Sequence, residues 1–208
     1  MSAAADGTAP RLVFALDATM SRQPTWDLAA EVQAGMFDAA AAIGSLAVQL
    51  VYFRGAGECR ASRWVGNARD LGSMMSTVAC RSGRTQIGRV LSHVRSEVGR
   101  GPVRALIYVG DAVEEDADEL CAAAGELGLL GVKAFLFHEG GDPATAAIFA
   151  EVARVAGGAA FPFDLRAPAT LAALLRAVAA YASGGRPALD RLARREPEAR
   201  RLLGAIPS

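Results

Sequence analysis

Short apolar runs alternate along the chain with longer segments in which apolar residues recur at helical spacing. The apolar runs predict buried strands. A more polar run directly after Gly55-Ala56-Gly57 predicts a short edge strand, antiparallel to its neighbour because the turn is so tight. The expected strands are Leu12–Leu16, Leu46–Phe53, Glu58–Trp64, Val103–Val109, Val132–Phe137 and Ala159–Pro162.

The segments between these runs predict helices. Thr25 is expected to cap the first one, with Asp27 in its first turn, and the helix is expected to run to about Ile43 and stop at Gly44. The other expected helices are Ala68–Val78, Gln86–Val98, Asp116–Leu129, Pro143–Val155 and Pro168–Ala182.

This alternation predicts an α/β fold: a doubly wound, mostly parallel six-stranded sheet with one short antiparallel edge strand and helices on both faces. Right-handed crossovers place the carboxyl ends of the parallel strands on one edge, where ligands of such sheets usually bind. Residues 1–10 are expected to form a flexible N-terminus and residues 11–183 one domain. Residues 184–208, with six arginines and leucines at roughly helical spacing, are expected to form a C-terminal helical tail that packs back on the domain or frays.

Composition narrows the function classes. The 208 residues are 52% apolar and 21% charged, as in an ordinary globular protein. Basic and acidic residues balance at 22 each, so the charge gives no reason to expect a nucleic acid or a membrane surface as partner. No apolar stretch reaches the ~18 residues needed to span a bilayer, and residues 1–10 lack the features of a signal peptide. Three cysteines without metal-ligand spacing suggest free thiols in a reducing compartment, so we expect a cytoplasmic protein.

Oxygen-bearing side chains follow two of the expected strands and precede one helix. Asp17, Thr19 and Ser21 come directly after the first strand, spaced two residues apart. Asp111 follows the strand that ends at Val109, and Thr85 lies in the loop before the third helix. Three loops that offer only oxygen ligands indicate a hard divalent cation such as Mg²⁺.

These residues, in this order, resemble the metal-ion-dependent adhesion site (MIDAS) of von Willebrand factor A (VWA) domains. The resemblance covers about residues 11 to 183. Similar proteins include stand-alone bacterial ones, among them some associated with tellurite resistance. It implies that Asp17, Thr19, Ser21, Thr85 and Asp111 hold Mg²⁺, with Mn²⁺ or Ca²⁺ as alternatives. The family usually has serine at the position of Thr19, and Asp-Gly where this chain has Asp111-Ala112.

The function implied is a non-catalytic interaction module in which the ion binds an Asp or Glu side chain of a partner protein. Arg22, Gln23, Trp26 and Glu114 are candidates for the rim of the binding face. Trp26 is equally compatible with anchoring the first helix to the core. For Glu114, Glu115 and Asp116 we favour a role as first-turn acids of the following helix.

Two alternatives remain open from the sequence. One is a Mg²⁺-dependent phosphohydrolase of the haloacid-dehalogenase type with Asp17 as nucleophile. That family has a second aspartate where this chain has Thr19, and a lysine between its two aspartate motifs, whereas Lys133 comes after both. It also has a cap domain, for which this chain shows no segment. The other alternative is a VWA-like scaffold whose loops serve structure only.

Overall fold

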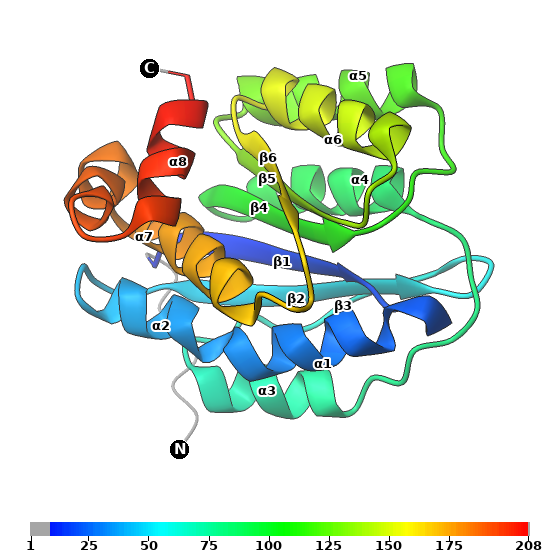
Figure 1. Ribbon diagram of the computed structural model, residues 1–208, viewed down its shortest axis with the longest axis horizontal. Coiled ribbons are helices and arrows are strands. Elements are labelled where there is room, and N and C mark those ends of the chain that lie inside the picture. The colour runs from blue at the N-terminus through cyan, green and yellow to red at the C-terminus, as the bar shows by residue number, and fades with distance from the viewer. Residues whose placement is uncertain (1–8, 208) are drawn as a thin grey trace.

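Six strands form one sheet in the order β3-β2-β1-β4-β5-β6 (Figure 1). The structure, a computed structural model, describes residues 9–207, with the backbone but not the side chain of Ser21. Neighbouring strands are parallel except β2 and β3, which pair in antiparallel fashion, so the predicted fold class is confirmed. The strands are β1 (Arg11–Asp17), β2 (Ala47–Arg54), β3 (Glu58–Ala61), β4 (Val103–Gly110), β5 (Lys133–Glu139) and β6 (Ala159–Phe163).

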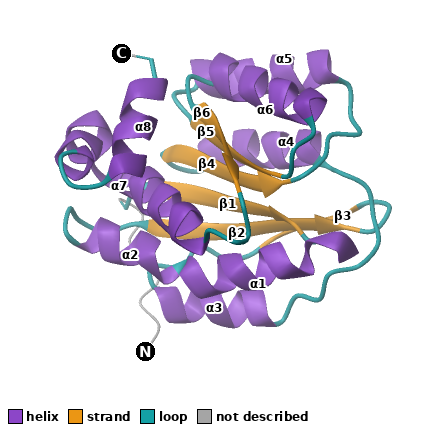
Figure 2. Ribbon diagram, viewed as in Figure 1, coloured by secondary structure: helices purple, strands orange, loops and turns teal. Residues whose placement is uncertain are grey.

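Helices cover both faces of this sheet (Figure 2). In β1, Leu12, Phe14 and Leu16 face one core, while Val13 and Ala15 face the other. The strand therefore needs apolar residues at every position, which explains its uninterrupted apolar run. One face packs against α1 (Gln23–Val32), α2 (Ala34–Ala41), α3 (Ala68–Ser76), α7 (Pro168–Ala193) and α8 (Pro197–Ala205), and the other against α4 (Ile87–Val98), α5 (Ala117–Leu129) and α6 (Pro143–Val155).

The segment after β1 differs from the predicted single helix. It begins with a 3-10 turn, η1 (Met20–Arg22), continues as α1 and is interrupted at Gln33 before α2. Thr25 does not cap the helix. It lies in the first turn of α1, buried, and donates its hydroxyl to the Glu139 carboxylate at the end of β5. A contact across 114 residues of sequence thus replaces the local cap that the sequence suggested.

The C-terminal segment belongs to the core. α7 continues through a kink at Gly184 and Gly185, where Gly185 has a φ of 64°, a conformation that favours glycine. Beyond the kink Leu189 and Leu202 are fully buried in the same core as α1 and α2. The residues described beyond position 183 therefore pack on the domain, while residues 1–8 of the expected N-terminus and Ser208 lie outside the described residues.

The strand order reverses beside β1, and this places the candidate site. The chain moves from β1 to β2 on one side and returns to β4 on the other, so the loops after β1 and β4 diverge at their carboxyl ends. In doubly wound sheets this divergence forms the ligand-binding crevice. Asp17 ends β1, and Asp111 directly follows β4.

Candidate metal centre

Asp17 is a buried carboxylate held by its own loop. Its side chain is 4% exposed, and its Oδ1 accepts the Thr19 N–H at 2.7 Å. Burial raises the pKa of Asp17 to about 6, against the lowering effect of hydrogen bonds from Thr19. The nearby Asp111 carboxylate raises this pKa further, and the Arg22 guanidinium lowers it. The carboxylate therefore lacks sufficient compensating positive charge.

Asp111 lies close to Asp17 and is paired with an arginine. Its Oδ2 is 3.1 Å from Nη2 of Arg22, while Nη1 of the same guanidinium is 2.5 Å from Glu139 Oε2. Arg22 directly follows the Asp17–Ser21 loop and is largely buried, with 14% of its side chain exposed. The guanidinium thus links the turn after β1 to the loop after β4 and to the end of β5, and it fixes one oxygen of Asp111.

Thr85 is joined to the Asp111 loop through Glu114. The Glu114 N–H donates to Thr85 Oγ1 at 3.0 Å, and the Thr85 N–H donates to Glu114 Oε2 at 2.8 Å. This reciprocal pair holds the buried Thr85 side chain beside the loop that follows β4. The hydroxyl accepts one hydrogen bond and retains a lone pair for another ligand.

Glu115 caps a distant helix. The N-cap position of α4, Gln86, makes no side-chain capping hydrogen bond, and the Glu115 carboxylate instead accepts the N–H groups of Ile87 and Gly88 at 2.9 and 2.8 Å. The interpretation of Glu114 and Glu115 as first-turn acids of α5 was wrong, because α5 begins at Ala117 behind its own cap, Asp116. Both glutamates hold the Thr85 loop instead.

Replacing Glu115 with alanine is expected to lower the free energy of unfolding by about 1–2 kcal/mol, because the first two N–H groups of α4 lose a charged acceptor. Urea unfolding at constant m-value measures the loss. Glu119→Ala, which removes an exposed carboxylate from the first turn of α5, is the matched control and should change little. Equal losses in both variants would contradict the capping role.

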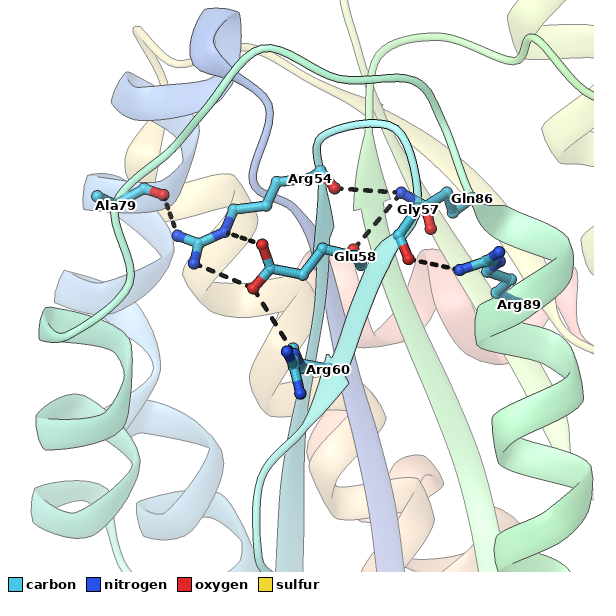
Figure 3. Close-up of polar contacts among 7 residues, drawn as sticks. All are labelled: Arg54, Gly57, Glu58, Arg60, Ala79, Gln86 and Arg89. Atoms are coloured by element: carbon cyan, nitrogen blue, oxygen red, sulfur yellow. Dashed lines mark hydrogen bonds and ion pairs between the residues drawn. The ribbon is translucent and has the colours of Figure 1, made fainter.

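The β2–β3 hairpin supports the Thr85 loop from the other side (Figure 3). Arg54, at the end of β2, donates to the Ala79 carbonyl at 2.5 Å and pairs with Glu58 at 3.0 Å. The Gln86 side-chain amide donates to the carbonyls of Arg54 and Glu58, at 3.3 and 3.5 Å. The residue beside Thr85 is therefore fixed to the hairpin while Thr85 itself is fixed to Glu114.

A buried hydroxyl lies beneath this edge. The Tyr108 side chain is 1% exposed, and its Oη finds no hydrogen-bond partner among the described residues. A Cβ added at Gly110 would lie 2.9 Å from this oxygen, so the hydroxyl is next to the residue before Asp111. Burial raises the pKa of Tyr108 well above its ordinary value, and the carboxylates of Asp17, Glu115 and Asp111 add to this effect. A buried hydroxyl without a partner is uncommon in proteins, and this one lies directly beneath the loop that carries Asp111.

The predicted rim residues have different fates. Trp26 is not at a rim: it is 2% exposed, donates its indole N–H to the Met75 carbonyl at 3.2 Å and packs edge-on against Tyr52, so it anchors α1 to the core. Gln23 is exposed and donates to Asp27 one turn further along α1, at 2.8 Å. Arg22 lies within the ion-pair network rather than free at its border, whereas Glu114 is exposed beside Thr85. The Ser21 side chain lies outside the described residues.

The donors present fit a hard divalent cation. Asp17, Thr19, Thr85 and Asp111 offer carboxylate and hydroxyl oxygens at one sheet edge, and the Tyr108 hydroxyl nearby has no hydrogen-bond partner among the described residues. Within residues 9–207 no group of three or more His, Cys, Asp or Glu side chains is placed to hold a metal ion. Binding here would therefore depend on the hydroxyls as well as the two aspartates, a donor set suited to Mg²⁺.

Several partners of the site were missed from the sequence. Glu139 and Tyr108 lie inside or at the end of apolar runs, where a strand assignment explains them completely.

In sequence comparisons no family model and no curated protein matches the chain. Among the residues that the structure describes, no helix has the length and apolar character required to cross a membrane.

Solved structures resemble the fold. A von Willebrand factor type A protein from Catenulispora acidiphila aligns with 85% of this chain and 43% of its own, at a TM-score of 0.62 and 18% identity. The VWA domain of SpRpn10 aligns with 79% of this chain and 95% of its own, at a TM-score of 0.61 and 9% identity. Proximal thread matrix protein 1 of the mussel byssus, with a zinc-occupied MIDAS motif, aligns with 83% of this chain and 46% of its own, at a TM-score of 0.64 and 15% identity.

Two of these three proteins extend well beyond the matching region, since the chain spans less than half of their length. TM-scores of 0.61 to 0.64 over most of this chain show that the three proteins share its fold across the aligned region. This chain has the fold of a von Willebrand factor A domain.

Proposed function

We propose that this chain is a non-catalytic interaction module, in which a Mg²⁺-type ion held at the edge of the sheet binds an acidic side chain of a partner protein. Asp17, Thr19, Ser21, Thr85 and Asp111 would hold the ion. The observation that carries the proposal is the buried Asp17 carboxylate beside Asp111, whose negative charge the hydrogen bonds from Thr19 and the Arg22 guanidinium offset only in part. When bound, the ion supplies the missing positive charge and an open coordination position for a carboxylate from outside.

The residues of the chain prepare this site. The Thr19 N–H fixes one oxygen of Asp17, Arg22 fixes one oxygen of Asp111, and Glu114 fixes the Thr85 hydroxyl. These three potential ligands are thus held by neighbours before any ion arrives, which lowers the entropy lost on binding. The mussel protein with a zinc-occupied MIDAS motif supports metal binding on this fold.

The site lacks the lysine that a phosphohydrolase of the haloacid-dehalogenase type would use. Lys133 is the only lysine of the chain, and it donates to the Gly157 carbonyl at 2.8 Å at the start of β5, the end of the strand remote from Asp111. The position of Thr19 also offers a hydroxyl where that chemistry needs a second carboxyl group. We therefore favour binding over catalysis.

Magnesium titration tests the metal site directly. At a concentration about a hundredfold above its Kd, Mg²⁺ should raise the free energy of unfolding by about 2.7 kcal/mol, and chelator should remove the gain. Asp111→Ala should abolish it, whereas Asp118→Ala, which removes a neighbouring exposed carboxylate on α5, should retain it. No stabilisation of the wild type by Mg²⁺, Mn²⁺ or Ca²⁺ would refute the proposed metal site.

The partner step needs a separate experiment. Immobilised wild-type protein should capture a protein from the native lysate in Mg²⁺ and release it in chelator, and the Asp111→Ala protein should capture none. Capture that persists unchanged in chelator would show that the ion does not mediate the interaction.

A further inference from the structure

Arginines gather on one side of the candidate metal centre. Residues 54–61 and 77–89 contain five arginines and one glutamate, and no lysine or aspartate. We call this surface the arginine flank; it comprises the β2–β3 hairpin, the loop before α4 and the first turn of α4. Its arginines are Arg54, Arg60, Arg81, Arg84 and Arg89.

The contacts of the flank bring these segments together. The Arg89 guanidinium donates to the Gly57 carbonyl at 2.6 Å, and the Arg84 N–H donates to the Gly55 carbonyl at 3.2 Å. The hydrogen bond with Arg54 is the main cause that lowers the pKa of the Glu58 carboxyl. Arg81 lies close enough to Glu58 to lower this pKa further. Figure 3 shows Arg54 and Arg60 of the hairpin contacting Glu58, and Arg89 of α4 reaching Gly57 in the hairpin turn.

The positive charge of the flank is largely uncompensated. Glu58 is its single acid, and it pairs with Arg54 at 3.0 Å and with Arg60 at 3.7 Å. Arg60, Arg81, Arg84 and Arg89 are exposed. One carboxylate cannot neutralise four exposed guanidinium groups, so the surface attracts anions.

Carboxylates lie on the opposite side of the metal centre from the arginine flank. Residues 111–119, between β4 and α5, contain six acids and no basic residue. Because β2 and β4 are the two neighbours of β1, Asp17 lies between the positive and the negative surface. Thr85 marks the boundary, since it follows the exposed Arg84 and is hydrogen-bonded to Glu114.

We propose that the arginine flank binds an acidic segment of the protein partner, running from the metal centre across the β2–β3 hairpin. This inference rests on the proposed interaction function of the same edge and names the chemistry of the partner beyond a single carboxylate. A nucleic acid is a poorer occupant, because its uniform negative charge would also meet the six carboxylates of residues 111–119. A protein segment can carry its acidic residues over the arginine flank alone and have none opposite residues 111–119.

Two synthetic peptides of equal length, composition and zero net charge test the inference. One carries its glutamates as a block followed by its lysines, and the other alternates them. The wild type should bind the block peptide about tenfold more tightly at low ionic strength, because several weak exposed ion pairs form together, and the preference should shrink at about 0.5 M salt. Fluorescence anisotropy measures both affinities, with a single-stranded DNA oligonucleotide as third probe.

Charge reversal then assigns the preference to the flank. Arg81→Glu/Arg84→Glu should abolish the preference, and the neutral Arg81→Gln/Arg84→Gln should reduce it, as measured in variants that unfold cooperatively like the wild type. Arg104→Glu/Arg200→Glu, which reverses two exposed arginines at the start of β4 and on α8, is the matched control and should keep it. Equal binding of the two peptides by the wild type, or DNA bound as tightly as the block peptide, would overturn the inference.

The peptide preference is separable from the metal site. Its ratio should persist in chelator, because the arginines act without the ion, while Mg²⁺ should strengthen binding of both peptides through their glutamates. A preference without any Mg²⁺ effect would refute the metal site alone. A Mg²⁺ effect without preference would refute the arginine flank alone.

Discussion

Asp17→Asn is expected to stabilise the metal-free protein at neutral pH while abolishing metal binding. The pKa of Asp17 in the folded protein is about 6, compared with 3.8 for an unperturbed aspartate, because burial disfavours the charged form. Asparagine resembles the protonated side chain, and its Oδ1 can still accept the Thr19 N–H. The variant therefore avoids the unfavourable ionisation and lacks the charge that would bind an ion.

The sign of the pH dependence follows from this raised pKa. Between about pH 4 and pH 6 the folded protein retains a proton that the unfolded chain has released, so the free energy of unfolding falls as pH rises. The difference between a pKa of 3.8 in the unfolded chain and about 6 in the folded protein corresponds to about 3 kcal/mol of stability, which is fully lost above about pH 6. The asparagine variant has no ionisable group at position 17, so this pH-dependent loss of stability is absent.

Urea unfolding in chelator at about pH 4 and about pH 8 measures the effect. The variant should be more stable than the wild type by up to about 3 kcal/mol at the higher pH and nearly equal at the lower. Mg²⁺ at about a hundredfold its Kd should nearly close this gap at the higher pH, because it stabilises only the wild type, by about 2.7 kcal/mol. Asp38→Asn, an exposed carboxylate on α2, is the control and should show no pH-dependent difference. A stability change that is the same at both pH values would contradict the buried, destabilising role of Asp17.

The location of the candidate site could be predicted because it depends on local pattern. An apolar run that ends in Asp17-Ala18-Thr19 predicts a buried strand followed by polar ligands, and the run before Asp111 does the same. Parallel strands then bring both aspartates to one edge without any knowledge of side-chain packing. The Gly55-Ala56-Gly57 turn similarly predicts the antiparallel edge strand that supports the Thr85 loop.

The supporting contacts could not be predicted, because they join residues far apart in the sequence. Thr25 has the chemistry of a helix cap, but its hydroxyl reaches Glu139, and Glu115 precedes α5 but caps α4, 27 or 28 residues away. Tyr108 belongs to an apolar strand, and only the structure shows its hydroxyl next to Gly110 without a described partner. Each of these choices depends on which strands become neighbours, and no local propensity contains that information.

Gly83→Ala is expected to disrupt the site from outside its ligand set. An added Cβ would lie 2.3 Å from the Gly55 nitrogen and 2.7 Å from its carbonyl oxygen, distances that the backbone of the hairpin turn cannot accommodate. The loop that carries Thr85 must move away from the hairpin, which also breaks the hydrogen bond from the Arg84 N–H to the Gly55 carbonyl. We expect a loss of about 1–3 kcal/mol in the free energy of unfolding, the range for overpacked sites.

The affinity for Mg²⁺ should fall by about tenfold or more in the same variant, because metal ligands must be held to within about 0.5 Å. Gly125→Ala is the matched control: an added Cβ there contacts nothing within 4 Å, and alanine is the better helix former in α5.

A double-mutant cycle with Thr85→Ala separates the effect of the Gly83→Ala methyl group on stability from its effect on Mg²⁺ binding. If the loop acts on the ion through Thr85, Gly83→Ala should weaken Mg²⁺ binding in the wild type but add little to Thr85→Ala, while its effect on stability remains. Additive losses of Mg²⁺ affinity would instead mean that Gly83 affects the ion by a route independent of Thr85.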